Sequence, residues 1–223
     1  MQKNVIIVCE DLFGLEVYSI LNEINMYVAR ERLSDDTYDV KGFISNNPQP
    51  FGMVDNQSKP ILGNIDSWQP IDDEQYVMGI KDPENKEYAA KVLKDKGAKF
   101  LTILTPWTLT PDRTCIGEGC VISNYSFKDG AVFDEFVTMI NVMAGAAHVG
   151  AYTTIQAFAN ITNADIGKKV RIGSHAFIME HIKIGDNSRI YPGSMVYANV
   201  KPNQKMAGIP ANRMKYRKLV EEA

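Results

Sequence analysis

The pattern of hydrophobic and polar positions changes near residue 105. Before this point, short apolar runs alternate with segments whose apolar residues recur at helical spacing. After it, a branched aliphatic residue returns about every six positions. Two periods in one chain predict two domains, residues 1–105 and 106–223, because each period suits a different architecture.

The first half has the pattern of an α/β domain. A helix is expected from residue 15, where Leu15, Ile20 and Ile24 share one face. A second helix is expected between Asp82, which can cap its start, and Gly97, which suits its end. Alternating strands and helices predict a Rossmann-like parallel sheet. Its strands should be the four apolar, β-rich runs at 4–9, 38–45, 75–80 and 99–104.

The second half has the pattern of a parallel β-helix. From Val149 to Val196 the aliphatic step is six, except for a step of five from Ile161 to Ile166. Six residues make one flat side of such a coil, with the aliphatic side chain inside and glycine or a small polar residue at the tight corner. Three sides close a coil, and stacked coils bury a continuous core. The segment 213–223 predicts a short C-terminal helix that caps the open end.

Composition excludes several classes of function. The net charge of -3 leaves no broad basic surface for a nucleic acid. The longest apolar runs are too short to cross a bilayer, and the N-terminus lacks the pattern of a signal peptide. The cysteines, Cys9, Cys115 and Cys120, form no CxxC pair, which indicates a reduced, cytoplasmic setting.

Three motifs carry a resemblance to a known family: GFISNNP (42–48), PILGNIDSW (60–68) and AGIPANRM (207–214). With the two-domain order, they make the chain similar to the sialic-acid O-acetyltransferase and bacillosamine N-acetyltransferase family of sugar acyltransferases. The resemblance implies a left-handed β-helix, a homotrimer, and acetyl-CoA as co-substrate. It also implies acyl transfer to an amine or hydroxyl of a small-molecule sugar or nucleotide sugar, which the N-terminal domain would bind.

The same resemblance points to His148 as the catalytic base. Members of the family carry IN, six further residues and then HD or HE, and INVMAGAAH keeps the separation from Asn141 to His148. A histidine suits the role because it is neutral near pH 7. The acid that should follow is absent, however, and Val149 comes at once. Counting back from Val149 without a gap puts Gly145 and Ala146 in that place, and no base remains.

Two functions therefore stay open. The first is an acetyl-CoA-dependent sugar acyltransferase in which His148 and Asn141 are catalytic. The alternative is a non-catalytic trimeric scaffold, or a sugar-nucleotide-binding module, that has lost the base. A serine- or maltose-type acetyltransferase is less favoured, because those families lack such an N-terminal domain.

The family's binding residues map onto this chain in part. Small residues let the pantetheine arm of the cofactor approach the coil backbone, and here they would be Ser174, Gly193, Gly208 and Pro210. The substrate-binding residues implied on the acceptor side are Gly14, Asn46 and Lys81.

The acceptor side also departs from the family. The glycine-rich first turn is reduced to Gly14, and the acidic pair after the second strand is replaced by Ser45 and Asn46. Lys81 stands in IKD where the family has IGD, and it could contact a phosphate. Glu10 and Asp11 would instead repel phosphate, so binding of a nucleotide sugar here is in question.

The remaining chemistry-bearing residues have structural interpretations. Glu180 and His181 are adjacent on a strand, so they point to opposite faces. His175 is expected at the rim of the cofactor groove, and Cys115 and Cys120 as small coil residues. No spacing of histidines, cysteines or acids predicts a metal site.

Overall fold

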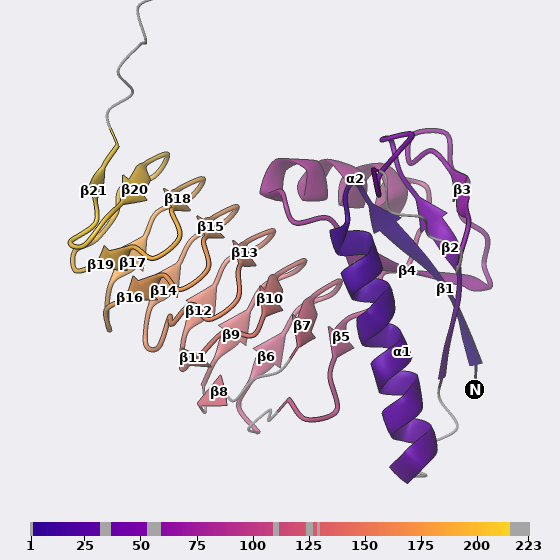
Figure 1. The fold of residues 1–223 in the computed structure, drawn as a ribbon, viewed down its shortest axis with the longest axis horizontal. Coiled ribbons are helices and arrows are strands. Elements are labelled where there is room, and N and C mark those ends of the chain that lie inside the picture. The colour runs from indigo at the N-terminus through magenta and orange to yellow at the C-terminus, as the bar shows by residue number, and fades with distance from the viewer. Residues whose placement is uncertain are drawn as a thin grey trace, which may run out of the picture.

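The structure is a computed structural model that describes residues 2–31, 37–52, 59–108, 112–123, 127–128 and 130–214. The expected C-terminal helix at 213–223 lies almost wholly outside the described residues. In the described part the N-terminal half is built on a sheet, and a three-sided coil follows it from β5 to β21 (Figure 1).

The N-terminal sheet is parallel, with the strand order β3-β2-β1-β4. Its strands are β1 (Gln2–Cys9), β2 (Thr37–Ile44), β3 (Ile61–Gly63) and β4 (Glu74–Gly79), and its helices are α1 (Phe13–Glu31) and α2 (Pro83–Asp95). Val5 and Ile7 of β1 pack with residues of α1, whereas Ile6 and Val8 pack with residues of α2. Strand β1 is therefore covered on both faces, which explains its unbroken apolar run.

Two strands of this half differ from expectation. The predicted strand at 99–104 is divided, because Phe100 forms a single bridge to Tyr76 whereas β5 (Ile103–Leu104) pairs with the coil strand β7. The edge strand β3 was not expected from the sequence. Its residues Ile61 and Leu62 are exposed, so it lacks the apolar signature of a buried strand.

The second half is a stack of three-sided coils, as the six-residue period predicts. One side is the five-stranded sheet of β6 (Cys115–Ile116), β9 (Val132–Phe133), β12 (His148–Val149), β14 (Asp165–Ile166) and β17 (Lys183–Ile184). A second is the eight-stranded sheet of β5, β7 (Val121–Ser123), β10 (Thr138–Ile140), β13 (Thr154–Ile155), β15 (Arg171–Ile172), β18 (Arg189–Ile190), β20 (Lys205–Ala207) and β21 (Asn212–Arg213). The third side carries β8 (Phe127–Lys128), β11 (Ala144–Gly145), β16 (Phe177–Ile178) and β19 (Met195–Val196).

The aliphatic residue of each unit points into the coil. Val149, Ile166 and Ile172 are fully buried in one continuous cluster. Strands of successive coils pair in parallel, whereas the last pair, β20 and β21, is antiparallel. The last parallel strand of the eight-stranded side, β20, is thus paired with a returning segment of the same chain.

The glycines act differently from the expectation that they form the corners. The left-handed corner conformation is mostly adopted by other residues, among them Phe136, Asn163 and His175. A Cβ on Gly150 would lie 2.6 Å from the carbonyl carbon of Gly167 on the next coil. The glycine after the aliphatic residue is therefore needed because neighbouring coils approach closely there, and not for a positive φ.

Candidate functional site

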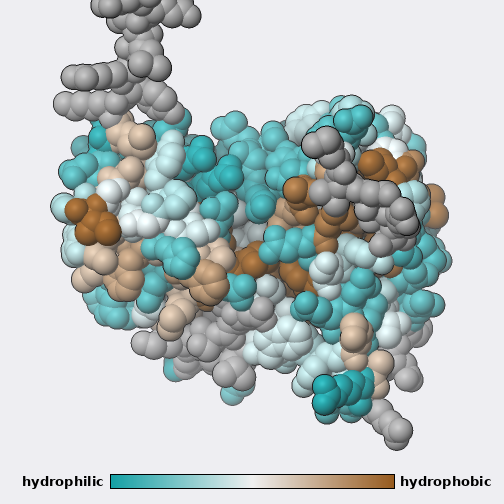
Figure 2. Space-filling view, in the orientation of Figure 1, coloured by the Kyte–Doolittle hydropathy of each residue, from teal (hydrophilic) through white to brown (hydrophobic). Residues whose placement is uncertain are grey.

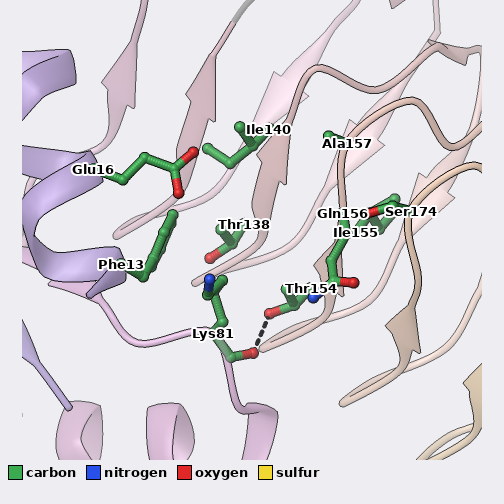
Figure 3. A pocket seen from close by; sticks show the side chains of 10 residues that line it. All are labelled: Phe13, Glu16, Lys81, Thr138, Ile140, Thr154, Ile155, Gln156, Ala157 and Ser174. Atoms are coloured by element: carbon green, nitrogen blue, oxygen red, sulfur yellow. Dashed lines mark hydrogen bonds between the residues drawn. The ribbon is translucent and has the colours of Figure 1, made fainter. Parts of the chain in front are cut away.

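A pocket of about 200 Å³, here called the junction pocket, lies between the N-terminal half and the eight-stranded side. Its lining comes from both halves: Phe13, Glu16, Lys81, Thr138, Ile140, Thr154, Ile155, Gln156, Ala157 and Ser174 (Figure 3). Apolar residues gather on the surface where the two halves meet (Figure 2). The pocket thus combines an apolar setting with a few polar groups, as small-molecule sites do.

Lys81 joins the two walls of the junction pocket. Its Nζ lies 4.8 Å from the centre of the Phe13 ring, and its carbonyl accepts a 2.6 Å hydrogen bond from the Thr154 hydroxyl. The structure brings Lys81, predicted for the acceptor, together with Ser174, predicted for the cofactor. Gly14 lies beside Phe13 but is packed against the strand, because a Cβ there would lie 2.6 Å from Cβ of Cys9.

A buried lysine supports the floor of the junction pocket. Lys86 of α2 has no exposed surface, and its Nζ lies 2.8 Å from the hydroxyls of both Thr138 and Thr154. The carbonyls of Phe136 and Thr153 lie at 3.2 and 3.4 Å. Removal from water lowers the pKa of the Lys86 ammonium to about 7.

The sequence interpretation missed Lys86, although a signal was present. Lys86 shares the buried face of α2 with Ala89, Ala90 and Leu93. A lysine within an apolar helical stripe predicts an ammonium that must find oxygen partners inside the protein.

The predicted cofactor residues form a strip along one edge of the coil, here called the edge strip. Ser174 accepts a 2.9 Å backbone hydrogen bond from Gly193 on the next coil. Gly208 accepts one from Met195 and donates to the Ser194 hydroxyl. Pro210 follows in an exposed turn. The strip therefore runs from the junction pocket toward the last coil, with small residues along it.

His148 lies elsewhere, in a groove on the five-stranded side that also contains Asp134, Asp165 and Lys183. Its Nδ1 is 3.1 Å from Asp165 Oδ1, and its Nε2 is 3.5 Å from Asp134 Oδ1. These acids belong to neighbouring coils, since His148 pairs with Asp165 across the ladder. No acid follows the histidine in the sequence, but a carboxylate of the next coil lies beside its ring.

The structure does not bring the other predicted catalytic residue to His148. Asn141 occupies a corner directly after β10, and the side that carries β11 separates it from β12. His175 stacks on Phe158 at another corner, with ring centres 5.1 Å apart. His181 is an exposed corner residue. Among the described residues, no histidine lines the junction pocket.

A third pocket, here called the strand-edge pocket, has a volume of about 410 Å³. It lies where β1, β2 and β4 end at the carboxyl edge of the N-terminal sheet. The lining residues are Glu10, Asn46, Asn47, Ile65, Ile80, Asn85, Tyr88 and Ala89. Asn46, predicted for the acceptor, therefore lines a different pocket from Lys81, although Ile80, next to Lys81 in the chain, lines the strand-edge pocket too.

The cysteines fit structural roles. Cys9 and Cys120 are buried, which raises the pKa of each thiol to about 12. Cys115 is exposed, and none of the three is in a disulfide. Over the ranges that the structure describes, no group of three or more histidines, cysteines or acids could hold a metal ion. No helix in those ranges combines the length and apolarity needed to span a bilayer.

Comparison with known proteins shows what the repeat resembles. Residues 163–198 match the model for bacterial transferase hexapeptide (six repeats). This part of the coil, from β14 to β19, is thus similar to the bacterial transferase hexapeptide repeat. The curated relatives include GlmU of Trichlorobacter lovleyi, 24% identical over 58% of this chain and 27% of that protein. Galactoside O-acetyltransferase of Escherichia coli K12 is 49% identical over 20% of this chain and 22% of that protein. The chain spans about a quarter of these relatives.

Solved structures match the chain along almost its whole length. The acetyltransferase domain of PglB from Neisseria gonorrhoeae, in complex with acetyl coenzyme A, has a TM-score of 0.79 at 16% identity, covering 96% of this chain and 100% of that one. PerB from Caulobacter crescentus, in complex with CoA and GDP-perosamine, has a TM-score of 0.73 at 12% identity, covering 95% and 97%. With the hexapeptide match, this likeness of fold indicates a left-handed β-helix.

Proposed function

We propose that the protein is an acetyl-CoA-dependent acyltransferase that transfers an acetyl group to an amine or hydroxyl of a sugar. The observation that carries this proposal is the junction pocket, where Ser174 of the edge strip meets Lys81 and Glu16 of the N-terminal half. The hexapeptide array and the fold shared with acetyltransferase structures support it.

The donor would lie along the edge strip, with its thioester end at the junction pocket. Gly193 has a φ of 67° and open space around the position of a Cβ, so a pantetheine arm could lie directly against the backbone there. Gly208 and Pro210, near the last coil, would be at the adenine end. Ser174, which lines the junction pocket, would donate through its hydroxyl to the developing oxyanion.

In the reaction the acceptor nitrogen or oxygen attacks the thioester carbonyl, and no covalent acyl-enzyme forms. His148 would take the acceptor's proton, and the CoA thiolate would leave and be protonated. Asp165 would orient the imidazole, as a carboxylate does in a catalytic triad. His148 lies on the five-stranded side, whereas the junction pocket lies on the eight-stranded side. A single active centre would therefore contain both only if they came from two copies of the chain.

A homotrimer would supply this second copy. The third side and its corner expose large apolar residues, among them Met143, Phe158 and Tyr197. An exposed apolar patch of this kind marks an interaction surface. Packing such sides against each other would bring the His148 groove of one copy toward the junction pocket of another.

The test is release of free thiol from acetyl-CoA with a panel of amino, neutral and nucleotide sugars. Release with some acceptor is expected, and His148→Asn should lower the rate by about 10²–10⁴-fold, the usual contribution of a general base. His181→Asn is the matched control, because asparagine already occupies several corners of this coil. No release with any acceptor would refute the proposed function, and equal loss in both variants would refute the role of His148 as the base.

One observation favours the alternative of a non-catalytic binding module. Both ring nitrogens of His148 face carboxylates, so neither points freely at a substrate in this arrangement. In that case calorimetry would detect binding of acetyl-CoA or a sugar nucleotide by a stable trimer, with no thiol released from any mixture.

A further inference from the structure

The strand-edge pocket is placed where open parallel sheets bind ligands, at the carboxyl ends of the strands. Ile65, Ile80 and Ala89 form an apolar part of its lining. Its polar part consists of amides, one carboxylate and the Tyr88 phenol. No lysine or arginine belongs to this lining within the described part of the chain.

The groups that could hold a phosphate at this edge are already occupied. The N-termini of helices are natural phosphate sites because their backbone N–H groups are unpaired. Here the Asp11 carboxylate accepts a 2.8 Å hydrogen bond from the Phe13 amide at the start of α1. The Asp82 carboxylate accepts bonds of 3.1 and 3.2 Å from the amides of Glu84 and Asn85 at the start of α2. Both helix starts are thus capped by the chain's own acids.

The amides of the pocket are fixed by the chain but keep free capacity. Asn85 Nδ2 donates to Glu10 Oε2 at 2.6 Å, and Asn47 Nδ2 donates to the Glu10 carbonyl at 3.0 Å. Asn46 and Tyr88 both donate to Asp66 Oδ1, at 3.1 and 2.9 Å. An amide has two donors and two acceptor sites, so these contacts leave groups for the hydroxyls of a ligand.

The charge at this edge is negative. Burial raises the pKa of Glu10, and the neighbouring carboxylates of Asp11 and Asp82 raise it further, against the hydrogen bond from Asn85. Because Glu10 already lies near other carboxylates, binding of a further anion such as a phosphate beside it is electrostatically unfavourable.

We infer that the strand-edge pocket binds an uncharged, hydroxyl-bearing sugar and that Glu10 and Asp11 exclude nucleoside diphosphates. The inference rests on the proposed function for its role, because it makes the acceptor a sugar that is not linked to a nucleotide. The amides bind the hydroxyls, and Ile65, Ile80 and Ala89 pack against the apolar face of the ring.

The test is isothermal calorimetry of the full chain with a panel of uncharged methyl glycosides, and with UDP and GDP. At least one glycoside should bind, and neither nucleotide should bind as tightly. Asn85→Ala should weaken glycoside binding about fivefold, the effect of one lost hydrogen bond. Tighter binding of UDP or GDP than of every glycoside, or no glycoside binding, would overturn the inference.

A charge-removal variant tests the exclusion directly. Glu10→Gln with Asp11→Asn should raise the affinity for UDP and GDP, since asparagine still caps a helix while the repulsion is gone. Glu23 is an exposed residue of α1 that does not line the pocket. Glu23→Gln removes one negative charge there and should leave the affinity for UDP and GDP unchanged. Unchanged nucleotide affinity in the double variant would count against the role of these acids. Circular dichroism melting identifies any variant that fails to fold.

Two outcomes separate this inference from the proposed function. Glycoside binding without thiol release in the presence of acetyl-CoA would refute the function and leave the inference standing. Thiol release that requires a nucleotide sugar would do the reverse.

Discussion

Replacing Lys86 by methionine should change how the stability of the protein depends on pH. The lysine ammonium is fully buried, and its partners Thr138, Thr154, Phe136 and Thr153 are all neutral oxygens. Its pKa is lowered to about 7 in the folded protein, against 10.5 for an ordinary lysine. Methionine has a similar length and no proton to lose, so the variant removes the titration with little change of volume.

The direction in which the free energy of unfolding changes with pH follows from proton linkage. Between pH 7 and 10.5 the unfolded chain holds a proton on Lys86 that the folded protein has released. The free energy of unfolding therefore rises with pH across this window, with a slope that approaches ~1.4 kcal/mol per pH unit. From pH 7 to pH 9 the free energy of unfolding should increase by roughly 2 kcal/mol. This increase is lost again as the pH falls toward and through the folded-state pKa.

The assay is urea unfolding at constant ionic strength and protomer concentration, followed by tryptophan fluorescence from pH 7 to pH 9. Stopping at pH 9 limits an opposite effect from Cys9 and Cys120, whose pKa values are raised to about 12. The methionine variant keeps both thiols, so the difference between the two curves isolates Lys86. Lys91→Met, an exposed position on α2, is the control and should follow the unsubstituted protein. Parallel curves for Lys86→Met and the unsubstituted protein would refute the reasoning.

Three further outcomes are expected. Gly150→Ala should lower the free energy of unfolding by about 1–3 kcal/mol in urea titrations, because its Cβ would lie 2.6 Å from the backbone of the next coil. Ile172→Ala empties a fully buried site and should lower the free energy of unfolding by about 2–5 kcal/mol. Ile209→Ala, at an exposed turn, should lower it little. Equal melting temperatures for the two variants would contradict this expectation. Asp165→Asn should lower thiol release at least tenfold if this acid orients His148, and unchanged kinetics would show that it does not.

Much of the fold could be predicted because each half has a local period. The apolar run of β1 and the helical spacing of α1 encode a sheet covered on both faces, and six-residue units encode coil sides. The exposed edge strand β3 could not be found in this way, since its pairing with β2 depends on tertiary contact and not on its own pattern.

The candidate site was harder to predict because it depends on register between coils. His148 and Asp165 are 17 residues apart and meet only because each coil places a residue beside its counterpart on the next. Adding one coil length to His148 would have identified this acid, since that length is 17 residues here because of the five-residue step from Ile161 to Ile166. Lys86 was missed for a different reason, since its partners come from a part of the chain more than 50 residues away whose docking the sequence does not reveal.

The antiparallel pairing of β21 with β20 has a consequence for how coils can be added to this fold. A stack of coils that ended on a bare parallel rung would offer its N–H and C=O groups to another molecule and so could polymerise end to end. On the eight-stranded side, β20 of the last coil is paired with β21 of the same chain, and β7 of the first coil is paired with β5. On this side of the coil, whole coils can therefore be inserted or lost between β7 and β20 while both of these pairings are kept.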